Sequence, residues 1–166
     1  MTNGSSFGVS YALSSNTTDT TTTGVGGGAV TDPLNLDVDR GPAAEDRRHN
    51  LTANGNYNLP FGFLISGLFD YASGFPYNIT NSTLNYVRPA PYDSLRQDDY
   101  VDLDMRAGKA FKFKRRYIAA LFAEIFDLFN TNNFATYNGN VLSSGFGTPE
   151  TKNPKRTAQF GFRFDY

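Results

Sequence analysis

The chain has 166 residues, a formal net charge of -1 and no cysteine. The length suits one domain, the near-neutral charge argues against a nucleic-acid partner, and the missing cysteines exclude disulfides, thiolate metal sites and cysteine nucleophiles. Aromatic residues make up 15% of the chain. Together with the many Gly, Asn and Thr residues they favour strands and turns over helices.

No run approaches 18 consecutive apolar residues, which excludes a membrane-spanning helix. Residues 1–6 have neither the basic start nor the apolar stretch of a signal peptide. A membrane protein with this sequence must therefore cross as strands. Its export signal is then expected upstream of Met1, or the membrane interpretation is wrong.

Apolar and polar residues alternate in a first strand, 5–13, and more clearly in a second, 47–59. Because successive side chains of a strand point to opposite faces, Leu51 and Tyr57 share one face while four Asn residues share the other. That Asn row suits a wet lumen. The intervening segment, 14–46, is a polar, Gly- and Thr-rich loop.

A third strand, 63–73, follows the tight turn at Pro60-Phe61-Gly62. The next loop, 74–98, contains Pro76, Pro89 and Pro91, which are expected to keep it out of regular structure. The fourth strand, 99–111, has three charges on one face, and a short basic turn ends it.

Segment 116–130 is ambiguous. Ile118, Leu121, Phe122 and Ile125 fit the spacing of an amphipathic helix. A strand is favoured only because both neighbouring elements are strands. The last loop, 131–154, leads to a sixth strand, 155–166, with Phe160, Phe162, Phe164 and Tyr166 on one face.

Tight links therefore alternate with the long loops 14–46, 74–98 and 131–154, as periplasmic turns and external loops do in outer-membrane barrels. The predicted fold is all-β, an antiparallel meander of about six transmembrane strands. Aromatic residues gather near both ends of the strands, where membrane interfaces favour their rings. The side chains predicted to face lipid are Leu51, Phe63, Ile65, Phe69, Leu103, Met105, Leu121 and Ile125. Those predicted to face the lumen or a plug are Asp102, Asp104, Arg106, Glu124 and Arg163.

Several motifs, in this order, resemble the late barrel strands of TonB-dependent outer-membrane transporters, especially the Oar-like group. They are Glu45-Asp46-Arg47-Arg48-His49-Asn50-Leu51, Ser73-Gly74-Phe75-Pro76, Val101-Asp102-Leu103-Asp104-Met105-Arg106, Phe122-Ala123-Glu124-Ile125-Phe126-Asp127 and the ending Ala158-Gln159-Phe160-Gly161-Phe162-Arg163-Phe164. The resemblance covers about residues 5 to 166.

The resemblance implies that the chain, residues 1–166, is the C-terminal part of a 22-stranded barrel in the bacterial outer membrane. It implies energy-coupled passage of a bulky solute. The implied partners are membrane lipid, upstream barrel strands, a plug domain, the barrel assembly machinery and the TonB system. The terminal strand, with Phe160, Phe162, Phe164 and Tyr166, would serve insertion. Six strands are too few to close a barrel, so the chain is not expected to transport alone.

The sequence predicts no enzyme, cofactor or metal site. His49, the one histidine, is better explained as a polar strand-end residue than as a general base. A calcium loop is weakly suggested by the spacing of Asn35, Asp37, Asp39 and Asp46, but Arg40 stands where such a loop needs Gly, so a solvated acidic loop is preferred. The competing class is a soluble or surface-attached antiparallel β domain with an adhesive role.

Overall fold

The computed structural model of the chain describes residues 4–19, 32–81, 95–113 and 117–166. These residues form one six-stranded antiparallel sheet in the order β1-β4-β5-β8-β9-β12. Its strands are β1 (Ser6–Leu13), β4 (His49–Leu59), β5 (Phe63–Ala72), β8 (Tyr100–Phe113), β9 (Tyr117–Phe126) and β12 (Thr157–Asp165). Each long strand pairs with the next along the chain. The all-β antiparallel meander predicted from the sequence is therefore confirmed.

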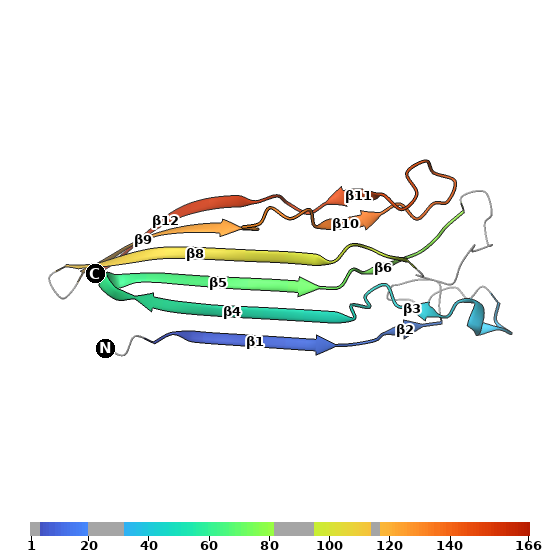
Figure 1. Cartoon of the computed structure of the whole chain (residues 1–166), viewed down its shortest axis with the longest axis horizontal. Coiled ribbons are helices and arrows are strands. Elements are labelled where there is room, and N and C mark those ends of the chain that lie inside the picture. Colours follow the sequence, from blue (N-terminus) through green and yellow to red (C-terminus); the bar gives the residue numbers. More distant parts are fainter. Residues whose placement is uncertain (1–3, 20–31, 82–94, 114–116) are drawn as a thin grey trace.

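Long loops and short links lie at opposite ends of this sheet. Figure 1 shows the six strands running side by side, with the described parts of the three long connections gathered at one end. At the other end, β4 and β5 are joined by the 3-10 turn η2 (Pro60–Gly62). The predicted basic turn after β8 falls partly on residues 114–116, which lie outside the described residues. We call the two ends the loop end and the short-turn end.

The pairing register gives the sheet two chemically different faces. Val9 is opposite Ala53, Ala53 opposite Phe69, and Phe69 opposite Leu103, so residues of one parity line up across the strands. One face holds the odd-numbered residues of β1, β4, β5, β8 and β9 and, through the pair of Ile125 with Ala158, the even-numbered residues of β12. We call it the apolar face. The opposite parity forms the polar face, where Asp, Asn, Arg and Glu residues gather among a few apolar ones.

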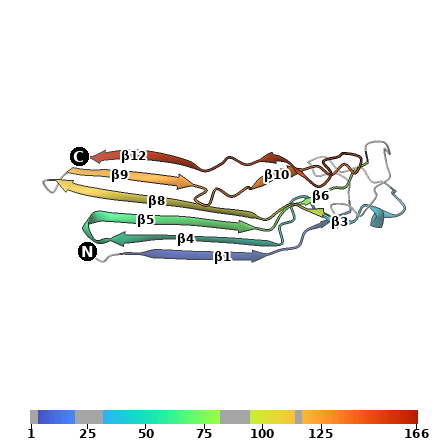
Figure 2. The ribbon, with the colours of Figure 1, turned by 45° about the horizontal axis from the view of Figure 1, so that its top comes forward.

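The sheet is a single layer without a hydrophobic core. Figure 2 shows the same layer turned by 45°, with no helix or second sheet covering the long strands. Among the described residues only Ala43 and Ala72 are buried apolar side chains. Leu121 is 53% exposed and Phe162 is 65% exposed. A soluble sheet would shield these two side chains, so the apolar face is built for a non-aqueous neighbour.

Residues 117–126 of the ambiguous segment 116–130 form a strand, β9, although their hydrophobic spacing fits a helix. β9 pairs over nine positions with β12 and over nine positions with β8, and these ladders satisfy its backbone groups. The strand ends at Phe126, four residues before its predicted end. Asp127 has φ 53° and Asn130 has φ 54°, and this left-handed backbone turns the chain out of the ladder. No helix in the described part of the chain is long and apolar enough to span a bilayer.

The described parts of the long loops contain more regular structure than their composition predicts. Each extends its hairpin with a small two-stranded sheet: β2 (Thr17–Thr18) with β3 (Gly41–Pro42), β6 (Pro76–Tyr77) with β7 (Leu95–Arg96), and β10 (Phe134–Tyr137) with β11 (Pro149–Lys152). The first loop also holds the 3-10 turn η1 (Leu36–Val38). The expectation that Pro76 excludes regular structure is wrong, because a proline fits at the edge of such a short ladder.

Two loops are also tied to each other at the loop end. Thr80 forms a bridge with Asn140, and the Thr80 amide donates to the Gly139 carbonyl at 2.9 Å. The rings of Tyr77 and Tyr137 stack with centroids 5.5 Å apart. The second and third loops therefore form one connected surface.

Candidate functional site

A row of polar side chains crosses three strands on the polar face. Arg106 of β8 pairs with Glu124 of β9, with Nη1 and Oε1 3.0 Å apart. The Gln159 side-chain amide of β12 donates to the other oxygen of the same carboxylate. Glu124 is thus held from both sides, as the register predicts, because it lies opposite Arg106 and Gln159. Opposite charges directly across a ladder stabilise the pairing.

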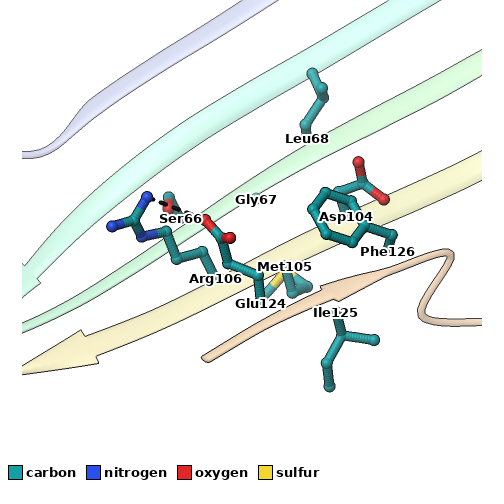
Figure 3. A pocket seen from close by; sticks show the side chains of 9 residues that line it. All are labelled: Ser66, Gly67, Leu68, Asp104, Met105, Arg106, Glu124, Ile125 and Phe126. Carbon is teal, nitrogen blue, oxygen red and sulfur yellow. Dashed lines mark ion pairs between the residues drawn. The ribbon is translucent and has the colours of Figure 1, made fainter. Parts of the chain in front are cut away.

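This ion pair lies at one side of a shallow hollow of about 220 Å³ on the polar face. Figure 3 shows Arg106 and Glu124 pointing toward one another, beside Ser66 of β5. Leu68, Asp104 and Phe126 also line the hollow. The hollow therefore offers both charged and apolar surface to a facing molecule.

An aromatic ring packs against the guanidinium of Arg106 in a cation–π contact. Phe122 lies with its ring centroid 4.0 Å from the Arg106 Cζ atom. The same ring covers Gly161 of β12, where an added Cβ would fall 2.1 Å from the ring carbon Cζ of Phe122. Glycine leaves room for the ring at this position, so Gly161 permits the packing of Phe122 beneath Arg106.

Acidic residues lie nearer the loop end of the same face. Asp102 accepts a hydrogen bond from the Tyr100 hydroxyl at 3.0 Å, and it is paired across the ladder with Asp70. Asp70 in turn accepts a hydrogen bond from Thr52 at 2.7 Å. Asp104 accepts the backbone amide of Asp127 at 3.0 Å and so fixes the turn that ends β9. Each of these carboxylates accepts a hydrogen bond from a nearby donor. The ion pair of Arg106 is made with Glu124 instead.

Arg163 does not join this row. Its Nε lies 3.0 Å from Asp165 of its own strand, and its side chain is 72% exposed. On the other face of β12 the four aromatic residues predicted to serve insertion are all exposed, from 52% at Phe164 to 88% at Tyr166. The ring of Phe164 stacks on Tyr117 with centroids 6.0 Å apart.

The register places all eight residues predicted to face lipid on the apolar face. It places the five residues predicted to face the lumen on the polar face. The parity of each strand was correct in both groups. That the two faces meet lipid and lumen stays a prediction at this point.

A second polar cluster ties the loops to the sheet. Arg96 of β7 forms an ion pair with Asp46, whose side chain is only 4% exposed. The same guanidinium donates to the carbonyl oxygens of Asp46 and Gly74, at 3.1 and 3.2 Å. Asp46 also accepts the Asn16 amide at 2.7 Å, so it connects the first loop to the second. We call Asp46, Arg96 and Asn16 the loop clasp.

The electrostatics of the clasp favour the charged carboxylate. Burial alone would raise the pKa of Asp46, but the hydrogen bonds from Arg96 and Asn16 and the positive charge of Arg96 outweigh it. The pKa of Asp46 is therefore held below its usual value of 3.8. Asp46 is thus an ionised, hydrogen-bonded anchor.

Arg47, the next residue, points onto two aromatic rings. Its Cζ atom lies 3.9 Å from the Phe75 ring centroid and 5.7 Å from that of Tyr100. Burial lowers the pKa of Arg47. The Phe75 ring therefore packs against the guanidinium of Arg47 at the loop end of the sheet.

The clasp and Arg47 were not identified as a site from the sequence. The solvated acidic loop expected from Asn35, Asp37, Asp39 and Asp46 is confirmed at the exposed Asp37 and wrong at Asp39, which is fully buried, and at Asp46, which is paired. In the sequence, Asp46 and Arg47 stand out only because they belong to the motif 45–51. That motif does not identify Arg96, which lies 50 residues from Asp46, as the partner of Asp46. Within the described ranges, no group of three or more His, Asp or Glu residues is arranged to hold a metal ion.

Comparison with known proteins agrees with this architecture. A family model described as "Outer membrane beta barrel domain" matches residues 1–90 and 81–159. No curated protein and no solved structure matches the chain. The matched segments cover most of the chain and contain five of the six long strands and the beginning of β12. The chain therefore belongs to the outer membrane beta barrel domain family, and it is a protein of the bacterial outer membrane.

Proposed function

We propose that the sheet is a section of barrel wall whose apolar face contacts lipid and whose polar face lines the lumen. The observation that carries the proposal is the exposure of large apolar side chains on one face, such as Phe160 at 87% and Leu121 at 53%, in a chain without a core. In water these side chains would cost free energy, and acyl chains remove that cost. The paired charges around Arg106 suit an aqueous interior.

We further propose that the chain supplies only part of that wall. Its edge strands are β1 and β12, and each has one side without a ladder partner among the described residues. An unpaired backbone group in hydrocarbon costs several kcal/mol, and bacterial barrels begin at eight strands. Further strands must therefore pair with both edges. A 22-stranded barrel, with this chain as its C-terminal part, meets that need.

The proposed activity is TonB-dependent, Oar-like transport of a bulky solute, without catalysis by this chain. Two features of the structure support it. The motifs that carry the resemblance contribute Asp46 to the loop clasp, and they contain Asp102, Asp104 and the residues of the Arg106 row. These charges also cover a wide area of one face, as a wall around a plug would require. Asp102, Asp104 and Arg106 are the residues we assign to plug contact, and β12 to recognition by the assembly machinery.

A soluble adhesive domain finds no support in these observations. Such a domain would need the apolar face to be covered by other parts of its own chain, whereas Phe7, Phe160 and Phe162 are 80, 87 and 65% exposed. The family match also indicates the outer membrane.

Orientation in the membrane tests the wall proposal directly. The chain has no cysteine, so single cysteines can be introduced at the loop end, as Ser144→Cys, and at the short-turn end, as Phe61→Cys. A membrane-impermeant maleimide added to intact cells should label position 144 and leave position 61 unlabelled until the outer membrane is opened. Equal labelling of both positions in intact cells, or labelling of position 61 alone, rejects the wall proposal.

Coupling to TonB needs a separate experiment. Two strains of the same bacterium are compared, one lacking this chain and one lacking TonB. Each strain should lose uptake of the same bulky solutes. Uptake that survives the loss of TonB rejects the coupling. Purified chain in liposomes loaded with carboxyfluorescein should release the dye no faster than protein-free liposomes, and solute-selective flux would show that the chain transports alone.

A further inference from the structure

One charged side chain lies on the apolar face. The register assigns to this face the odd-numbered residues of β1, β4, β5, β8 and β9 and the even-numbered residues of β12. Among all of these, Lys109 of β8 is the only Lys, Arg, Asp or Glu. A lysine on a lipid face costs about 2–4 kcal/mol at the bilayer midplane and about 0–1 kcal/mol near an interface. A position near an interface and a favourable partner would each reduce this cost.

The contacts of Lys109 are aromatic and not acidic. Its Nζ atom lies 4.4 Å from the Phe63 ring centroid and 5.1 Å from that of Phe111. In the part of the chain that the structure describes, no carboxylate lies within ion-pair distance of Nζ. The two rings attract the ammonium group but do not neutralise its charge. The ammonium group thus keeps donors for an anionic acceptor from outside the chain.

The depth of Lys109 is fixed by the short-turn end of the sheet. Lys109 is opposite Phe63, the first residue of β5, directly after the turn Pro60–Gly62. Gly62, with φ 81°, packs so closely on β8 that an added Cβ would lie 2.6 Å from the Ala110 carbonyl oxygen. Lys109 is therefore level with the turn, where lipid headgroups meet the acyl region. The neighbouring same-face row toward the end of β8 is also aromatic, with Phe111 opposite Ala119, and Phe113 lies one row beyond it.

We propose that Lys109, Phe63 and Phe111 bind the headgroup of an anionic phospholipid in the leaflet at the short-turn end. The ammonium group donates to the lipid phosphate, while the exposed Leu121, opposite Lys109 on β9, contacts the acyl chain. Free phosphate would gain nothing from Leu121 or the rings, so the site fits a lipid. The inference depends on the apolar face meeting lipid, as proposed above.

Photo-crosslinking in intact outer membranes tests the site without removing the chain from its assembly. Leu121 is replaced by photoreactive benzoylphenylalanine, and the headgroups of the crosslinked lipids are identified by mass spectrometry. Phosphatidylglycerol and cardiolipin should be enriched about fivefold over their share in the membrane, the preference that one lysine near an anionic surface gives.

Three variants identify the source of that preference. Lys109→Gln should reduce the enrichment to the bulk ratio, and Lys109→Arg should keep it. Lys112→Gln removes a lysine near the same end but on the polar face, and it should leave the enrichment unchanged. Lipid crosslinks at the bulk ratio in the unmodified background overturn the headgroup site while leaving the lipid face intact. Absence of any lipid crosslink at position 121 overturns the wall proposal itself.

Discussion

Phe160 and Gln159 are neighbours in β12 whose side chains point to opposite faces. Phe160 lies on the apolar face opposite Ala123, and Gln159 lies on the polar face opposite Glu124. Phe160 is 87% exposed, so it has little protein packing to lose. In a water-soluble sheet, Phe160→Arg would change stability by no more than about 0.5 kcal/mol. A lipid-facing position gives a very different result.

The magnitude follows from the depth of Phe160. Its row runs from Phe160 through Ala123 and Ala107 to Ile65, in the interior of all four strands. Phe160→Ala should cost about 2 kcal/mol, because most of a phenyl ring is withdrawn from lipid. Phe160→Arg should cost about 1–2 kcal/mol beyond that, between the interface and midplane penalties for arginine, because this row lies two residues from the row of Lys109. Gln159→Arg places the same charge one residue away, beside Glu124, and should cost less than about 0.5 kcal/mol.

The assay is urea denaturation in isolated outer membranes, followed by loss of protease protection of the sheet. The urea concentration at the midpoint should be highest for Gln159→Arg, lower for Phe160→Ala and lowest for Phe160→Arg. If both arginine variants unfold at the midpoint of the unmodified chain, or if Gln159→Arg is the more damaging, the assignment of faces to lipid and lumen is refuted.

Other predictions concern the two polar clusters. Gly161→Ala should destabilise the sheet by about 1–3 kcal/mol through overpacking against Phe122, measured by the same urea midpoint. Gly108→Ala, where the nearest atom is 3.3 Å away, should cost less. Arg96→Met leaves the Asp46 carboxylate buried without its cation and should destabilise the loop end by about 2–3 kcal/mol. Limited proteolysis should then cut the first two loops faster. An unchanged rate of cutting would contradict the clasp. Because the folded pKa of Asp46 is lowered, its stabilisation is fully present above pH 3.8 and is lost as pH falls through the lower folded pKa. Hydrogen exchange of the Asn16 amide, corrected for intrinsic rate, should lose protection in that acidic range and keep it at pH 5.

The sequence pattern predicted most of the sheet because period-2 alternation needs no knowledge of the partner strand. Parity alone assigned Leu121 and Glu124 to opposite faces, and the ladders agree. Segment 116–130 could not be decided locally, since Leu121, Phe122 and Ile125 fit a helix equally well. The neighbouring strands decided it, because β8 and β12 supply hydrogen bonds that an isolated segment lacks.

The loop clasp could not be predicted because its contacts join residues far apart in the chain. Asp46 and Arg96 are 50 residues apart, and Asn16 is 30 residues from Asp46. Polar composition indicated loops there, and it says nothing about which charges pair. Lys109 was overlooked for a different reason: its significance appears only when the whole apolar face is assembled and no second charge is found on it.

The connection between the second and third loops has a consequence for recognition by other molecules. Because Thr80 bonds to Gly139 and Tyr77 stacks on Tyr137, residues from both loops contribute to one patch at the loop end. An antibody or phage that reaches this patch would meet a discontinuous epitope. Peptides copied from either loop alone would reproduce only half of it.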